Sequence, residues 1–187
     1  MINMAVHVFI DNSNIWISLQ NLCRKLEGVP PVAVRVYLKN LEDYVVRGRK
    51  TGVKWIAGSI PPEAEDFIRL AKEMGYDTKF LKRVPEGNTM REQGVDMQLQ
   101  LQMSRTLNRF NSNEVMAVLT GDSHVDVDSE VSFIEVIGDA LKMGWTVEVY
   151  AVKDSISETL YQPLKDQYGD SLQIEYLDDV YQSITFV

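Results

Sequence analysis

The strongest constraint on this 187-residue chain is a regular alternation of short apolar segments with longer segments of helical periodicity. The short segments predict five strands, at residues 5–10, 53–60, 77–84, 114–120 and 145–152. The helical segments lie between or after them, at about 14–25, 32–46, 61–74, 95–109 and 133–144. Strands that alternate with helices at this interval predict an α/β fold, in which helices cover both faces of a mainly parallel sheet. This arrangement is a three-layer α/β/α sandwich.

The C-terminal part of the chain continues the pattern less regularly. Residues 156–168 predict a further helix, and residues 172–177 are either a short edge strand or an ordered tail. No internal repeat, low-complexity tract or linker divides the sequence. We therefore expect one domain over residues 1–187, with a core at about 6–152 and a C-terminal extension at 153–187.

The composition narrows the class of protein. A hydrophobic fraction of 45% with 25% charged residues is typical of a globular domain and argues against disorder. The single cysteine, Cys23, cannot form an internal disulfide, and no Cys and His residues have the spacing of a zinc site. No apolar run is long enough to span a membrane, and the N-terminus lacks the pattern of a signal peptide. The expected location is the cytoplasm or the nucleus, without membrane contact.

Acidic side chains gather where the predicted strands end. Asp11 ends the first strand, Asp122 follows the fourth, and Asp96 opens the helix before the fourth strand. Asp126 and Asp128 come next in the loop after Asp122. Ligands of such sheets bind outside the carboxyl ends of the strands, and hard cations take carboxylate oxygens. The sequence therefore predicts a site for Mg²⁺ or Mn²⁺ made by these five acids.

Each acid also has a purely structural interpretation, which the sequence leaves open. Asp11 and Asn14 are residue types that cap helices, and a helix begins directly after the first strand. Asp96 would complement the macrodipole of its own helix, and Asp122 would form a turn with Gly121.

Basic residues are concentrated in two stretches, although the formal net charge is −8. The first stretch contains Arg47, Arg49, Lys50 and Lys54, and the second contains Lys79, Lys82, Arg83 and Arg91. The second stretch leads into Asp96, so we expect Lys82, Arg83 and Arg91 to bind substrate phosphate. Exposure to solvent without such a contact is the alternative for both stretches.

Three short motifs in a fixed order resemble a known family. They are DNSN at 11–14, GVD at 94–96 and TGD at 120–122, and together they resemble the NYN family of PIN-like ribonucleases. The resemblance extends from about Val6 to Val152. Its later part is the closest, where LTGD and an acidic insertion precede SFIEVIGDALKMGWTVEVYAV.

The resemblance implies a PIN-like fold and a metal-dependent endoribonuclease that uses Mg²⁺ or Mn²⁺. Its catalytic positions correspond to Asp11, Asn14, Asp96 and Asp122. Many relatives carry a further acid directly before the phenylalanine, where this chain has Ser132. Asp126 or Asp128 is expected to take that place.

We therefore expect hydrolysis of RNA phosphodiester bonds at the acidic site. The alternative is a catalytically silent NYN-fold module that binds RNA or protein, which the missing acid and the negative charge favour. RNA is the expected partner, together with a protein partner or a second copy of the chain.

Overall fold

The structure of the chain is a computed structural model that describes most of its residues. The described ranges are 4–59, 64–81, 84–86, 89–91, 95–110, 113–121 and 133–187. Only the backbone is described at residues 59, 64, 81, 84–86, 89–91, 95 and 96.

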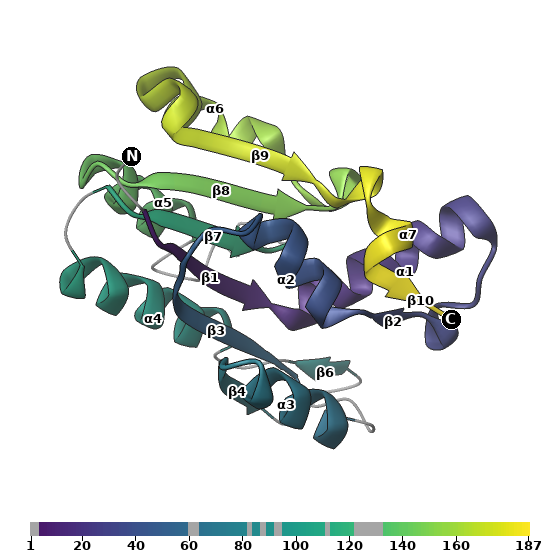
Figure 1. The fold of residues 1–187 in the computed structure, drawn as a ribbon. Helices are drawn as coiled ribbons and strands as arrows, with labels where there is room; N and C mark the ends of the chain where they lie inside the picture. Colours follow the sequence, from purple (N-terminus) through teal and green to yellow (C-terminus); the bar gives the residue numbers. More distant parts are fainter. Residues whose placement is uncertain are drawn as a thin grey trace.

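A six-stranded parallel sheet forms the centre of the molecule (Figure 1). Its strands run side by side in the order β4 (Asp77–Leu81), β3 (Thr51–Ser59), β1 (Val6–Asp11), β7 (Val115–Leu119), β8 (Thr146–Ala151) and β9 (Leu172–Tyr176). Every neighbouring pair in this sheet is parallel. The five predicted strands are confirmed, and the segment at 172–177 is an edge strand.

The first strand is apolar on both sides because both of its faces are covered. Val8 and Ile10 pack into one hydrophobic cluster, whereas Phe9 packs into the cluster on the opposite face. All six residues of β1 are buried. A continuous apolar run is the pattern expected for a central strand of a parallel sheet, and here it places Asp11 at the buried carboxyl end.

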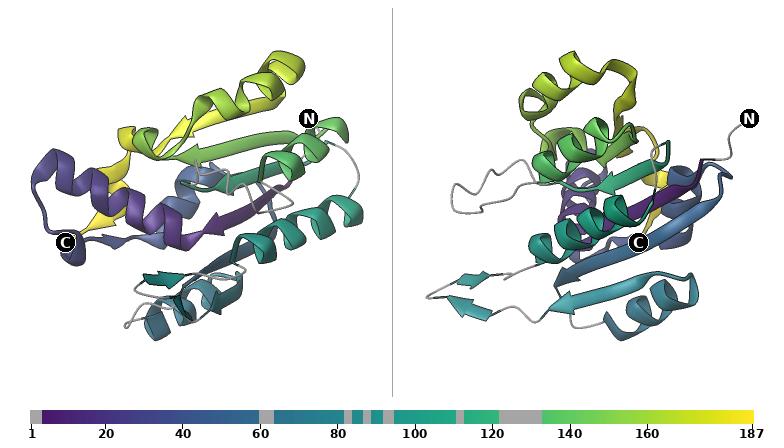
Figure 2. Two further views of the ribbon diagram at one scale, coloured as in Figure 1. Left: turned by 180° about the vertical axis from the view of Figure 1, so that it is seen from behind. Right: turned by 90° about the vertical axis from the view of Figure 1, so that its left-hand side faces the viewer.

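Helices form a layer on each side of the sheet, as the turned views of Figure 2 show. The first cluster contains residues from α1 (Asn12–Glu27), α2 (Leu38–Val46), α3 (Ala64–Glu73) and α7 (Tyr181–Ile184). The second contains residues from α4 (Val95–Arg109), α5 (Phe133–Lys142) and α6 (Glu158–Tyr168). The predicted three-layer α/β/α sandwich is therefore confirmed.

The prediction of one helix over residues 32–46 is wrong at its beginning. Residues Pro31–Ala33 form a short 3₁₀ helix, Arg35–Val36 form strand β2, and α2 begins only at Leu38. Strand β2 pairs antiparallel with β10 (Thr185–Phe186) near the end of the chain. Pairing with β10 stabilises an extended backbone at β2, in a segment whose β-branched residues favour that conformation.

The prediction of a polar loop over residues 85–94 is also incorrect. Strands β5 (Val84–Glu86) and β6 (Thr89–Arg91) form an antiparallel pair there, and β4 ends earlier than predicted, at Leu81. Three-residue strands are too short for a period-2 pattern to be recognised in a polar sequence.

The C-terminal segment joins the rest of the fold. After β8, the chain passes through 3₁₀ helices at Lys153–Ser155, Gly169–Ser171 and Leu177–Asp179, which alternate with α6 and β9. Strand β9 then pairs with β8, and α7 contacts α2. Residues 153–187 thus contribute an edge strand and part of a helix layer.

Candidate functional site

The order of the strands reverses direction beside β1. From β1 the chain builds outward through β3 to β4, and it then returns to the other side of β1 with β7 and continues to β8 and β9. The carboxyl ends of β1 and β7 are therefore neighbours at the point where the topology switches. In open α/β sheets this is the place where ligands bind. Asp11 ends β1, and Asp122 is two residues beyond the Thr120 that follows β7.

Asp11 is the N-cap of α1. Its side chain is 1% exposed, and its Oδ1 accepts a hydrogen bond of 3.1 Å from the backbone N–H of Asn14. Its Oδ2 accepts a second bond, of 2.6 Å, from the Asn14 amide Nδ2. The capping interpretation is confirmed for Asp11, whereas Asn14 lies inside the first turn of α1. A carboxylate has about four acceptor positions, so a side chain that caps a helix can also be a metal ligand.

The first turn of α1 brings partial positive charge to this edge. The helix is 16 residues long, and its N-terminal N–H groups carry the positive end of the macrodipole. Asn12 and Ser13 are buried there, at 6% and 7% exposure. The helix end therefore favours a nearby anion, whether the Asp11 carboxylate or a phosphate group.

Two glycines let the chain approach this turn closely. A Cβ atom added at Gly58, near the end of β3, would lie 3.1 Å from Asn12 Cβ and 3.2 Å from Ser13 Oγ. One added at Gly121 would lie 2.6 Å from Ser18 Oγ and 3.2 Å from the Asn14 carbonyl oxygen. The elements on both sides of β1 are therefore packed against α1 through positions without a side chain.

The topology brings Asp96 to the same edge. It is the second residue of α4, which connects the hairpin after β4 to the beginning of β7. Because β4 and β7 are parallel, α4 must run back from the carboxyl edge to the amino edge, so its first turn lies near the carboxyl edge. Only the backbone is described at Asp96, and its metal role stays a prediction.

The other predicted site residues are described in part or not at all. Asp122, Asp126, Asp128, Lys82 and Arg83 lie outside the described residues. Arg91 is the last residue of β6, with its backbone alone described. Among the described residues, no group of three His, Cys, Asp or Glu side chains could hold a metal ion. Asp11 is thus the one predicted metal ligand whose side chain the structure describes.

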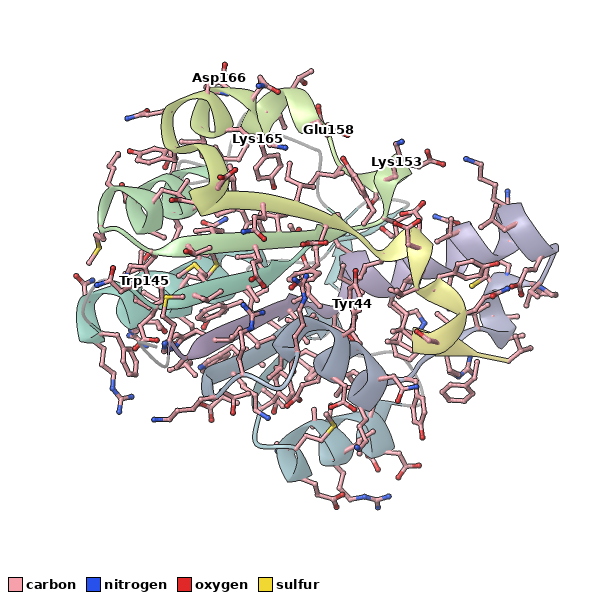
Figure 3. The ribbon with its side chains drawn as sticks, turned by 45° about the horizontal axis from the view of Figure 1, so that its top comes forward. Tyr44, Trp145, Lys153, Glu158, Lys165 and Asp166 are labelled. Carbon is pink, nitrogen blue, oxygen red and sulfur yellow. The ribbon has the colours of Figure 1, made fainter. Side chains whose placement is uncertain are left out.

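The first basic stretch is held by acidic partners. Arg49 makes a bidentate pair with the buried Glu148, at 2.6 and 2.8 Å, and Arg47 lies 3.0 Å from Glu175. Lys54 is paired with Glu42 at 2.9 Å. Tyr150 donates a hydrogen bond to Glu148, and Tyr44 on α2, labelled in Figure 3, packs against the Tyr150 ring.

This network stabilises the face under α2. Burial raises the pKa of Glu148. Hydrogen bonds from Arg49 and Tyr150 lower it by more than burial raises it, so the pKa lies below its ordinary value. Arg47 and Arg49 are therefore paired with acidic side chains of the same chain.

A buried histidine packs among aromatic rings away from the site. His7 on β1 is fully buried, and its Nδ1 accepts a hydrogen bond of 3.0 Å from the Val53 N–H. Its ring lies 4.5 Å from Phe110 and 5.1 Å from Trp145, which is labelled in Figure 3 at the beginning of β8. Burial is the largest influence on the pKa of His7 and lowers it.

No protein-family model matches this chain, and no curated protein sequence matches it. None of the described helices combines the length and the apolar composition needed to cross a membrane.

Proposed function

We propose that this chain is a metal-dependent ribonuclease that hydrolyses RNA phosphodiester bonds at the carboxyl edge of the sheet. The observation that carries the proposal is the meeting of β1 and β7 at the switch point of the topology. It puts Asp11 beside the strand that leads to Asp122, and α4 begins near the same edge with Asp96.

The residues present suit a hard divalent cation. Mg²⁺ and Mn²⁺ prefer oxygen ligands, and Asp11, Asp96 and Asp122 are all carboxylates. Asp126 and Asp128 follow in the same loop and are the further candidates for ligands. A bound ion supplies a water of lowered pKa and offsets the charge on the phosphate oxygens.

The side chains around Asp11 have separate tasks in this proposal. Asn14 fixes the orientation of the Asp11 carboxylate through its backbone N–H and its amide. The amino end of α1 faces the same edge and stabilises a phosphate group bound there. Lys82, Arg83 and Arg91 follow β4 and are proposed to hold the RNA backbone.

The test is cleavage of a labelled single-stranded RNA by the full chain with Mg²⁺, with Mn²⁺ or with EDTA. Asp96→Asn and Asp122→Asn should each lower the metal-dependent rate by about a hundredfold or more while the proteins stay folded. Asp139→Asn is the matched control, because Asp139 is an exposed acid that pairs with Lys142 on the same helix. Rates unchanged in both site variants would contradict the proposal.

The alternative is a silent module that binds RNA or protein without cleaving it. It is favoured by the capping geometry, in which both oxygens of Asp11 accept hydrogen bonds from Asn14. A silent module would cleave RNA with none of the metals, and millimolar Mg²⁺ or Mn²⁺ would not raise its free energy of unfolding.

A further inference from the structure

A small pocket lies between α1 and the chain that follows β8. Its volume is about 150 Å³. The second and third turns of α1 form one wall, and residues 152–155 form the other. Lys153, labelled in Figure 3, marks the place where the chain leaves β8 beside this pocket.

The lining combines an apolar surface with neutral polar groups. Leu22 and Val152 are 5% and 2% exposed and supply the apolar part. Ser18, Asn21 and Ser155 supply two hydroxyls and an amide. An amide offers both a donor and an acceptor, so Asn21 can pair with a ligand edge that carries both.

The rim carries two charges that largely cancel. Lys25 and Asp154 form an ion pair of 2.5 Å, and their side chains are 63% and 64% exposed. Each raises the tendency of the other to stay charged: the pKa of Lys25 is raised and that of Asp154 is lowered. With the positive charge neutralised by its partner, the pocket suits a neutral polar ligand better than an anion.

The pocket adjoins the proposed catalytic edge. The position of a Cβ atom at Gly121 is 2.6 Å from Ser18 Oγ and 3.1 Å from Ser155 Oγ, so both hydroxyls lie against the residue before Asp122. Ser18 also follows Asn14 by one turn of α1, a rise of about 6 Å. Ser18 and Asn21 follow Asp11 by seven and ten residues, a rise of about 10–15 Å along α1, so the base of a neighbouring nucleotide could span the distance from a phosphate bound at Asp11.

We propose that this pocket binds the pyrimidine base of a nucleotide next to the phosphate that is cleaved; this assignment of a substrate class rests on the proposed ribonuclease function. The base lies against Leu22 and Val152, and its Watson–Crick edge pairs with the Asn21 amide. The pocket is open to solvent on one side, and its volume of about 150 Å³ matches a single six-membered ring. The fused rings of a purine need more room.

The first experiment detects the pocket without cleavage. Uridine 5′-monophosphate is titrated into the full chain without metal, and the Asn21 side-chain amide is followed by NMR. We expect the Asn21 signal to shift with uridine monophosphate. The same shift should need at least a tenfold higher concentration of adenosine 5′-monophosphate. Asn21→Ala should weaken uridine monophosphate binding about fivefold, the effect of one neutral hydrogen bond. Asn108→Ala is the control, because Asn108 is an exposed asparagine on α4 whose amide donates a hydrogen bond to Ser104 O of the same helix.

The second experiment measures cleavage of a uridine-containing and an all-purine oligonucleotide. Asn21→Ala should raise KM about fivefold for the first substrate and leave its kcat and the all-purine KM unchanged. RNA cleavage without any shift of the Asn21 signal would refute base binding in this pocket and leave the proposed ribonuclease function intact. An Asn21 shift without cleavage would reject the nuclease and support a nucleotide pocket. Equal shifts with both nucleotides would refute the pyrimidine assignment.

Discussion

Replacing Asp11 with asparagine separates its capping role from its proposed metal role. Asparagine is as good an N-cap as aspartate, so the bond from the Asn14 backbone N–H is expected to survive. The Asn14 amide can turn over and present its oxygen to the new amide, which preserves the second contact as a neutral hydrogen bond. What Asp11→Asn removes is the negative charge.

The loss of stability can be worked out from these contacts. Because asparagine caps a helix as well as aspartate does, we count only the bond from the Asn14 amide, and a hydrogen bond to a charged group is worth about 1 kcal/mol more than a neutral one. A carboxylate at a helix N-terminus contributes about 0.3–1 kcal/mol more than a neutral group. We therefore expect Asp11→Asn to lower the free energy of unfolding by about 1–2 kcal/mol. Asp11→Ala also removes both hydrogen bonds of the cap, and we expect it to lose about 3 kcal/mol.

The assay is urea unfolding of the wild type and the two variants, with and without Mn²⁺. At a metal concentration of about ten times its dissociation constant, binding should stabilise the wild type by about 1.4 kcal/mol. Asp11→Asn should gain much less, and the control Asp139→Asn should gain as much as the wild type.

Two results would refute this reasoning at different steps. Equal stabilisation of the wild type and Asp11→Asn by Mn²⁺ would show that Asp11 is not a metal ligand. A loss of stability in Asp11→Asn as large as that in Asp11→Ala would show that the cap does not tolerate a neutral side chain.

Three further predictions test the surroundings of the site by urea unfolding. Arg49→Leu leaves the buried Glu148 without its bidentate partner and should lower the free energy of unfolding by about 3–5 kcal/mol. Adding Glu148→Leu should recover most of this stability, and equal losses in the single and double variants would contradict the prediction. Because the pKa of His7 is lowered in the fold, the free energy of unfolding should fall as the pH falls from about 7 to about 5. His7→Asn should reduce this dependence on pH, and an unchanged dependence would show that other groups cause it. Gly121→Ala should lose about 1–3 kcal/mol through its 2.6 Å approach to the Ser18 hydroxyl, and adding Ser18→Ala should restore part of it; a neutral effect of Gly121→Ala would show that the loop shifts freely.

The sequence predicts those elements whose signal is local. The helix at 95–109 has the same bounds in the structure, because its period and its polar boundaries lie within the segment itself. Strand β1 and the cap at Asp11 were predictable for the same reason. Residues 35 and 36 were assigned to a helix because the strand that pairs with them, β10, lies about 150 residues away in the sequence.

The pocket illustrates the same limit for function. Ser18 and Asn21 look like ordinary helix positions, and Ser155 like an ordinary turn residue. Only the parallel pairing of β1, β7 and β8 brings α1 and the end of β8 together. Asp11 was recognisable because an acid at the end of an apolar strand is unusual by itself.

The central place of β1 also constrains the order in which the protein can fold during synthesis. Of the six strands in the sheet, β1 comes first in the sequence, its partner β3 follows about 45 residues later, and its other partner β7 follows about 110 residues later. Until then, one edge of a strand that is wholly buried in the finished fold is without its neighbour. The pairing of β1 with β7, which also brings together the two ends of the proposed site, is therefore a late step. The two ends of the candidate site therefore meet when β1 gains its second neighbour, and β8 and β9, which complete the sheet, lie still later in the sequence.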